Sequence, residues 1–221
     1  MNLCLFDLDD TLLPFDSDHA WSQFVARQGW VDAAEFARRN DLFYEHYKAG
    51  TLDIHAYIEF ATRPWRDRPA SEALGAHARF MAEVVTPLHP AAVQLVHHHQ
   101  AQGDLVAIVT ATNEFVTAPI ARAFGVPHLL AVCLERGAAG NITGRIEGTP
   151  SFREGKTVRT LQWLEGLGHR LQDFERISVY SDSANDLPLL ELASDPVATN
   201  PSAPLEAIAR ERGWRILRLF S

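Results

Sequence analysis

The sequence contains little cysteine: its 221 residues include only Cys4 and Cys133. Each lies in an apolar run, and two isolated cysteines supply neither a disulfide framework nor the four ligands of a structural zinc site. We therefore interpret both as small buried side chains in a reducing compartment, and we expect the protein to be cytoplasmic.

Basic residues are scarce relative to acidic ones. The chain has 20 Lys and Arg against 28 Asp and Glu, which gives a formal net charge of −8. A general nucleic-acid-binding protein needs a basic face to neutralise phosphates, so this excess of acid argues against a nucleic-acid partner. A small phosphorylated substrate remains compatible with the composition, because a bound metal ion reverses the field in a single cleft.

Long hydrophobic runs are missing as well. The longest, such as residues 105–109, are a fraction of the roughly 20 residues that a membrane helix needs. Acidic residues follow the first apolar run before a secretory signal is long enough. We therefore expect no membrane partner. Hydrophobic residues still make up 47% of the chain, which is enough for the core of one large domain.

Short apolar runs bounded by polar turn residues alternate with helical patterns through most of the chain. Such runs predict buried strands, and their alternation with helices predicts a parallel sheet covered on both faces, a Rossmann-like doubly wound α/β fold. The predicted strands are 3–6, 105–109, 129–134, 177–180, 196–199 and a final edge strand at 216–220. The predicted helices are 91–102, 115–124, 156–167, 184–192 and 202–212.

Two segments interrupt this alternation. Residues 14–88 contain no convincing strand and are far too long for an ordinary loop. Their helical patterns lie at 18–28, 32–48, 53–62 and 71–85. We interpret residues 14–88 as an all-helical domain inserted after the first strand, with residues 1–13 and 89–221 forming the core. In the second interruption, glycines bracket residues 137–148 and predict a small hairpin.

Polar residues fall where the predicted strands end. Asp7 follows the first strand, Thr110 follows the second, and Asp182 follows the fourth. Asp186 comes four residues later, and Lys156 opens a predicted helix. In open parallel sheets, ligands bind beyond the carboxyl ends of the strands, so we expect these side chains to share one cleft.

Each of these residue types has chemistry to perform in such a cleft. Crowded carboxylates repel one another unless a hard dication joins them, and Mg²⁺ suits a set of carboxylate oxygens, carbonyls and waters. A carboxylate such as Asp7 can then attack phosphorus, while the metal and Lys156 balance the charge of the transferred group. Asp9 points the same way as Asp7 if the chain stays extended, and can act as acid and then as base.

Four local patterns carry a family resemblance. The pattern Asp7-x-Asp9-x-Thr11 after an apolar strand resembles the first motif of the haloacid dehalogenase-like phosphohydrolases. Thr110, Lys156 and the run 181–186 resemble the second, third and fourth motifs, in family order. A helical insertion between the first two motifs is where that family places its C1 cap. Its size, and the local sequences 110–113 and 155–156, resemble the phosphoserine-phosphatase-like branch.

The resemblance implies roles at a metal centre. Asp7 would be the nucleophile and a metal ligand, and Asp9 would be the general acid/base with its backbone carbonyl on the metal. Asp182 would bind Mg²⁺ directly. Asp186 would support the metal's waters or orient Lys156.

The resemblance also implies contacts to the substrate. Thr110 and Lys156 would hold the phosphoryl oxygens, and Thr112 and Asn113 would add further contacts to the phosphate. Asp16 is our candidate to face the leaving group from the cap. The alternative for Asp16 is a purely structural role, as the cap of the helix that begins near residue 18.

The cap departs from that of phosphoserine phosphatases at two positions. Asp16 stands where those enzymes use a glutamate, and our alignment places Glu59 where they use an arginine. Without that cation a substrate carboxylate is left unpaired, which argues against phosphoserine as the substrate. Nearby cations that could replace the missing arginine are Arg63, Arg66 and Arg68.

Together these patterns predict a Mg²⁺-dependent phosphomonoester hydrolase that acts on a small phosphorylated metabolite through an aspartyl phosphate. One alternative is a phosphotransferase or mutase on the same scaffold, in which a hydroxyl group rather than water accepts the phosphoryl group. A second alternative, from a different class, is a phospho-receiver-like signalling module, although receivers are shorter and lack a large insertion. No feature of the sequence specifies an oligomeric state.

Overall fold

The structure, a computed structural model, describes residues 1–220. Its main feature is a six-stranded sheet in the order β3-β2-β1-β6-β7-β8, in which all neighbouring strands are parallel. The predicted doubly wound α/β fold is therefore confirmed. The strands of this sheet are β1 (Leu3–Phe6), β2 (Leu105–Asn113), β3 (His128–Val132), β6 (Ile177–Ser181), β7 (Asp195–Thr199) and β8 (Arg215–Leu217).

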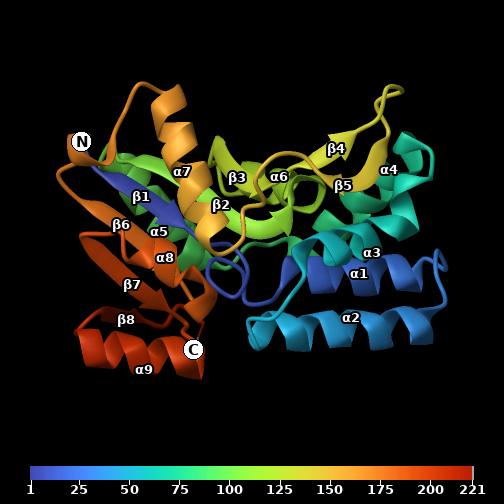
Figure 1. The fold of residues 1–221 in the computed structure, drawn as a ribbon, viewed down its shortest axis with the longest axis horizontal. Coiled ribbons are helices and arrows are strands. Elements are labelled where there is room, and N and C mark those ends of the chain that lie inside the picture. The colour runs from blue at the N-terminus through green and yellow to red at the C-terminus, as the bar shows by residue number, and fades with distance from the viewer. Residues whose placement is uncertain (221) are drawn as a thin grey trace.

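Helices cover both faces of the sheet, and strand β1 shows how the sequence encodes this (Figure 1). Leu3 and Leu5 pack with α7, α8 and α9, whereas Cys4 and Phe6 pack with α5 and α6. Alternate side chains of a strand point to opposite faces, so a continuous apolar run fits a strand buried on both sides. These helices and two short 3₁₀ turns are α5 (Pro90–Ala101), α6 (Glu114–Ala123), α7 (Glu154–Gly166), η2 (Leu171–Asp173), η3 (Ala184–Asp186), α8 (Leu187–Leu190) and α9 (Ala203–Arg212).

Residues 14–88, hereafter the helical segment, are all described and contain no strand. They lie beside the sheet, on the right in Figure 1. Three helices begin at an aspartate whose carboxylate accepts a backbone N–H, namely Asp16, Asp32 and Asp53, as expected for N-caps. Among residues 1–220, no helix is long and apolar enough to cross a membrane. The helices are α1 (Ser17–Arg27), α2 (Ala33–Lys48), α3 (Ile54–Arg66), α4 (Ala70–Phe80) and the π-helical turn η1 (Met81–Val85).

Three predicted strands were wrong in their boundaries. Strand β2 continues through Thr110 to Asn113, with a register shift in its pairing with β3. The predicted strand 129–134 is divided, because β3 ends at Val132 and β4 (Leu134–Arg136) pairs with β5 (Ile142–Ile146) in a separate antiparallel sheet. Strand β8 ends at Leu217 rather than at residue 220. An apolar run indicates burial but does not identify its partner strand, and the partner sets where each strand ends.

The β4–β5 hairpin, predicted from its glycines, packs against α3 of the helical segment. Gly144 in β5 has φ +88°, and a Cβ atom placed there would lie 1.9 Å from Nη1 of Arg66. The backbone conformation is what favours glycine here, because the Arg66 guanidinium is the end of a flexible side chain and can move aside.

Replacing Gly144 with alanine should destabilise the fold. The left-handed backbone costs an L-residue about 1–2 kcal/mol, which corresponds to a fall in Tm of roughly 2–8 °C for a chain of this size. The matched control is Gly75→Ala in α4, where an added Cβ meets nothing within 4 Å. Its Tm should stay the same or rise, because alanine favours a helix over glycine. Equal Tm values for the two variants in thermal denaturation would contradict this account of Gly144.

Candidate active site

The carboxyl ends of β1 and β6 bring two aspartates together. The two strands are neighbours in the sheet, and the backbone N–H of Asp7 donates to the carbonyl of Tyr180 at 2.9 Å. Asp182 follows β6 directly. The Thr11 hydroxyl lies 3.3 Å from a carboxylate oxygen of each aspartate and accepts the N–H of Asp182 at 3.0 Å. Sequence analysis placed Thr11 in the first motif but missed this positioning contact.

Lys156 is buried between two of the predicted site residues. Its Nζ donates to Asp7 at 2.8 Å and to Asp186 at 2.7 Å, and the residue is only 2% exposed. Burial opposes the charge of the lysine, but Asp186 and Asp7 outweigh it and raise the pKa of Lys156. Ser181, which the sequence did not single out, donates to the same oxygen of Asp186 at 2.7 Å. Asp186 therefore contacts Lys156 directly, while the two roles expected for Asp186 stay predictions.

Asp9 is surrounded by hydrogen-bond donors. One carboxylate oxygen accepts the Ser17 N–H at 2.8 Å, and the other accepts the Thr112 hydroxyl at 2.8 Å and the Thr110 hydroxyl at 3.4 Å. Burial, followed by the charge of Asp16, raises the pKa of Asp9 to about 6. A carboxyl group with such a pKa can both hold and release a proton near neutral pH, which is what a general acid/base requires.

The residues predicted to bind phosphate have other contacts in this structure. Thr110 is fully buried in β2, and its hydroxyl also accepts the N–H of Thr112 at 3.1 Å. Asn113 caps α6 by accepting the N–H of Val116 at 3.3 Å. Thr112 lines the pocket described next, whereas Asn113 does not. The phosphate contacts of these residues stay predictions.

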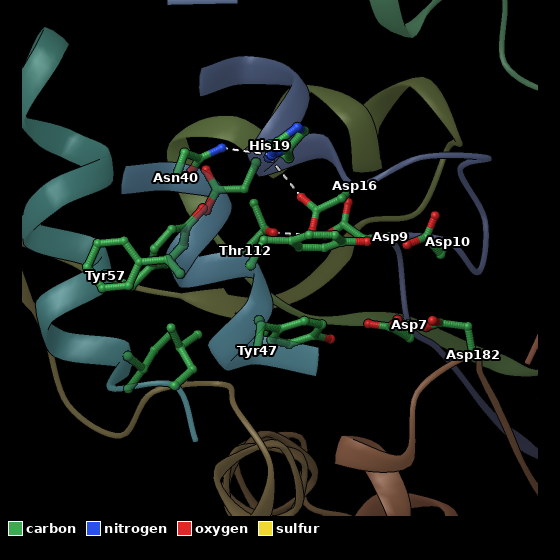
Figure 2. A pocket seen from close by; sticks show the side chains of 16 residues that line it. Asp7, Asp9, Asp10, Asp16, His19, Asn40, Tyr47, Tyr57, Thr112 and Asp182 are labelled. Carbon is green, nitrogen blue, oxygen red and sulfur yellow. Dashed lines mark hydrogen bonds between the residues drawn. The ribbon is translucent and has the colours of Figure 1, made fainter. Parts of the chain in front are cut away.

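A pocket lies between the carboxyl end of the sheet and the helical segment (Figure 2). The empty space at the pocket, including the part open to solvent, amounts to about 650 Å³. Asp16 lines it while also accepting the N–H of His19 at 2.8 Å, so the capping role and the substrate-facing position coexist in one residue. The lining residues are Asp7, Asp9, Asp10, Asp16, Asp18, His19, Asn40, Phe43, Tyr44, Tyr47, Leu52, Ile54, Tyr57, Ala111, Thr112 and Asp182.

Asp18 is a functional candidate that sequence analysis missed. It is 3% exposed, lines the pocket, and neither carboxylate oxygen has a hydrogen-bond partner. Burial and then the charge of Asp16 raise the pKa of Asp18 to about 8; Asp9 adds to the rise and the Tyr57 side chain opposes it. In the sequence, an aspartate at this position looks like an ordinary acidic residue in the first turn of a helix.

Within the described residues 1–220, no lysine or arginine lines the pocket. Glu59 is exposed on α3, and the three nearby arginines are engaged elsewhere. Arg68 pairs with Glu72 at 2.7 Å, and Arg66 lies against the β4–β5 hairpin. Arg63 lines a separate groove. None of these arginines replaces the cation that the sequence comparison found missing.

The donor set fits a hard dication. Burial raises the pKa of Asp182 well above its ordinary value, and the charges of Asp7, Asp10 and Asp186 add to that rise. A divalent cation would offset this repulsion. Within residues 1–220, no group of three His, Cys, Asp or Glu side chains has the geometry of a metal site. The predicted Mg²⁺ ligands differ from such a group, because they are the two carboxylates of Asp7 and Asp182 and one backbone carbonyl, that of Asp9.

Comparison with known proteins agrees with this geometry. The family described as haloacid dehalogenase-like hydrolase matches residues 4–191. A histidinol-phosphatase of Neisseria meningitidis serogroup C (strain 8013) is 45% identical over 217 residues, covering 98% of each chain. A solved protein of unknown function from Bordetella pertussis Tohama I is 52% identical, with a TM-score of 0.93 and 99% of each chain covered. A substrate-bound phosphoserine phosphatase has the same fold at 18% identity, with a TM-score of 0.69 over 98% of this chain and 92% of its own.

The chain therefore belongs to the haloacid dehalogenase-like hydrolases. It is a phosphatase of that family, which confirms the enzyme class expected from the sequence and the resemblance on which it rested. The receiver-like signalling alternative is left without support.

Replacing Asp18 with asparagine should remove part of the pH dependence of stability. The pKa of Asp18 is about 8 in the folded protein, against an ordinary value of 3.8. Between these values the folded protein holds a proton that the unfolded chain has released, so this residue lowers stability as the pH rises. The Tm of Asp18→Asn relative to wild type should therefore rise between about pH 5 and about pH 9. The expected gain is about 4 kcal/mol, or roughly 8–16 °C.

The matched control for this prediction is Asp41→Asn, an exposed aspartate on α2. Its Tm relative to wild type should be the same at both pH values, because its carboxylate is solvated in both states. Thermal denaturation of the three proteins at the two pH values is the measurement. Parallel curves for Asp18→Asn and Asp41→Asn would show that burial of Asp18 has no electrostatic cost.

Proposed function

We propose that the protein is a Mg²⁺-dependent phosphomonoester hydrolase that acts on a small phosphorylated metabolite through an aspartyl phosphate on Asp7. The observation that carries the proposal is the buried contact of 2.8 Å between Asp7 and Lys156, beside Asp182 at the carboxyl ends of neighbouring strands. This contact holds a carboxylate in one orientation next to a fixed positive charge. In this proposal residues 1–13 and 89–221 are the catalytic core, and the helical segment is a C1 cap.

The reaction divides into two balanced steps. A carboxylate oxygen of Asp7 bonds to phosphorus while the bond from phosphorus to the leaving-group oxygen breaks, and Asp9 gives that oxygen its proton. The leaving group departs as an alcohol. Water then attacks the phosphorus, Asp9 accepts the proton of that water, and Asp7 leaves as a carboxylate. Inorganic phosphate is released, and both aspartates return to their starting states.

Charge balance during both steps is the task of the surrounding residues. Lys156 and Thr110 hold phosphoryl oxygens, and Asp186 keeps the lysine in place from 2.7 Å. Asp7, Asp182 and the Asp9 carbonyl would hold Mg²⁺, with Asp186 supporting its waters. When bound, the ion supplies the positive charge that lets an anionic phosphate ester approach an anionic nucleophile.

We infer that the substrate is the phosphate ester of an amino alcohol, with histidinol phosphate as the first candidate. The relative at 45% identity over nearly the whole chain is a histidinol-phosphatase. Histidinol phosphate carries an ammonium group and an imidazole ring but no carboxylate. Both features suit a pocket with several aspartates, four aromatic rings from Phe43, Tyr44, Tyr47 and Tyr57, and no arginine.

Asp7→Asn should abolish turnover, because it removes the nucleophile of the first step. Asp9→Asn keeps the nucleophile but loses proton transfer, which is worth about 10²–10⁴-fold. With an aryl phosphate, whose leaving group needs little acid assistance, the first step should slow less than the second, in which Asp9 accepts the proton of water. The phosphoenzyme should therefore accumulate. Single-turnover kinetics with both ester types measure this, with Asp41→Asn as the control. Near wild-type turnover by Asp7→Asn would exclude a covalent role for Asp7.

The wild-type enzyme should prefer histidinol phosphate over phosphoserine by at least about 100-fold in kcat/KM, since the phosphoserine carboxylate finds no cation in the pocket. Release of free phosphate, measured with Mg²⁺ and without an acceptor alcohol, also separates a hydrolase from a phosphotransferase. Thorough chelation should stop the reaction and added Mg²⁺ should restore it. Equal kcat/KM for the two esters would refute the substrate assignment and leave the hydrolase assignment intact.

A further inference from the structure

One buried carboxyl group in the pocket, that of Asp18, has no hydrogen-bond partner within 3.5 Å among the described residues, and the only side-chain interaction that lowers its pKa comes from Tyr57. Seven residues among 1–220 have buried polar side-chain atoms without a hydrogen bond, and of these only Asp18 lines the pocket. Leaving a buried carboxylate unpartnered is costly, and such groups in native proteins call for a specific explanation. The other pocket carboxylates differ: Asp9 accepts bonds at both of its oxygens, and Asp16 accepts the N–H of His19.

The position of Asp18 indicates which part of a substrate it meets. Its carboxylate lies next to the Tyr57 side chain, since each shifts the pKa of the other. Figure 2 shows Tyr57 on the opposite side of the pocket from Asp7 and Asp182. A phosphate ester whose phosphorus lies at Asp7 therefore extends its organic part toward Asp18.

The charge of the pocket defines the chemistry of that organic part. Six aspartates line the pocket, and no lysine or arginine does so among residues 1–220. A carboxylate at the Asp18 end would meet only negative charge, whereas an ammonium group would form a charge-assisted hydrogen bond with a desolvated acceptor. The neighbouring Tyr57 and Phe43 rings favour a cation as well.

We propose that Asp18 binds the ammonium group of the substrate directly and thereby selects phosphate esters of amines that carry no carboxylate. This inference rests on the proposed phosphatase function and assigns the substrate-reading role to the carboxylate that the fold leaves without a partner. Asp16 then acts in a different way, by capping α1 and by adding to the negative field. Asp18 is a specificity-determining residue, separate from the groups that contact the phosphoryl group.

The test compares two esters that differ only in the ammonium group: histidinol phosphate and imidazolylpropyl phosphate, the same molecule without the amino group. At about pH 8 the imidazole ring is neutral and the amine is charged. Wild type should prefer the amine, and Asp18→Asn should lower the ratio of the two kcat/KM values by about 100-fold, the effect of removing one member of a buried charge pair. Asp41→Asn should keep the wild-type ratio. Circular dichroism verifies that each variant is folded.

Binding of histidinol itself, which has no phosphate, gives a second readout that is independent of catalysis. Calorimetry should detect it with wild type and find it at least about 10-fold weaker with Asp18→Asn. An unchanged ratio of kcat/KM in Asp18→Asn would overturn the proposal, as would a ratio that falls in Asp16→Asn but not in Asp18→Asn. Absence of any preference for the amine in wild type would overturn it too. Failure of the phosphatase function would look different, because wild type would then release no phosphate from any ester, aryl phosphates included.

Discussion

Crowding of carboxylates at one edge of the sheet is the constraint on which the rest of the structure depends. Among residues 1–220, the one cation that contacts this cluster is Lys156, which bonds to two of its members. The Thr11 and Ser181 hydroxyls donate to the same two, Asp7 and Asp186, and Thr11 also lies 3.3 Å from Asp182. Asp9 accepts from the Thr112 hydroxyl and the Ser17 N–H. The cluster consists of Asp7, Asp9, Asp10, Asp16, Asp18, Asp182 and Asp186. Burial and the neighbouring like charges raise the pKa of Asp9 and of Asp182, and we propose that this crowding prepares a proton donor at Asp9 and a cation site between Asp7 and Asp182.

The helical segment and the sheet are tied together by the groups that shape the site. The first N–H of α1, from Ser17, donates to Asp9, and the residue before it caps the same helix. On the other side of the pocket, the side chain of Asn185 donates to the carbonyl of Tyr47 at 3.1 Å. A change in the orientation of α1 or α2 would therefore alter the surroundings of Asp9 and the size of the pocket together. The proposed selection of substrate and the proposed proton transfer by Asp9 therefore depend on the same contacts between the helical segment and the sheet.

Two proteins of this family can share a fold and still differ in the residues that line the pocket. The phosphoserine phosphatase complex has the same fold at 18% identity. In this chain, however, our alignment places Glu59 where those enzymes use an arginine, and Glu59 is exposed and does not line the pocket. We propose that the negative pocket that remains favours positively charged leaving groups, because an unpaired buried carboxylate is a stronger discriminator than an apolar contact. In the proposed function, the core handles the phosphoryl group common to all substrates, and a few side chains of the helical segment distinguish among them.

The sequence by itself determined the fold class and the all-helical character of residues 14–88, and it predicted that Asp7, Lys156, Asp182 and Asp186 come together. It did so because strands buried on both faces leave continuous apolar runs, and because residues at the carboxyl ends of parallel strands must converge. It could not show the end of β2 or the division of β3 from β4, since pairing partners are distant in sequence. Only the tertiary structure showed the surroundings of Asp18, on which its proposed role rests. Its environment depends on Tyr57 from α3 and on the absence of any arginine directed toward it, and neither is visible in the first turn of one helix.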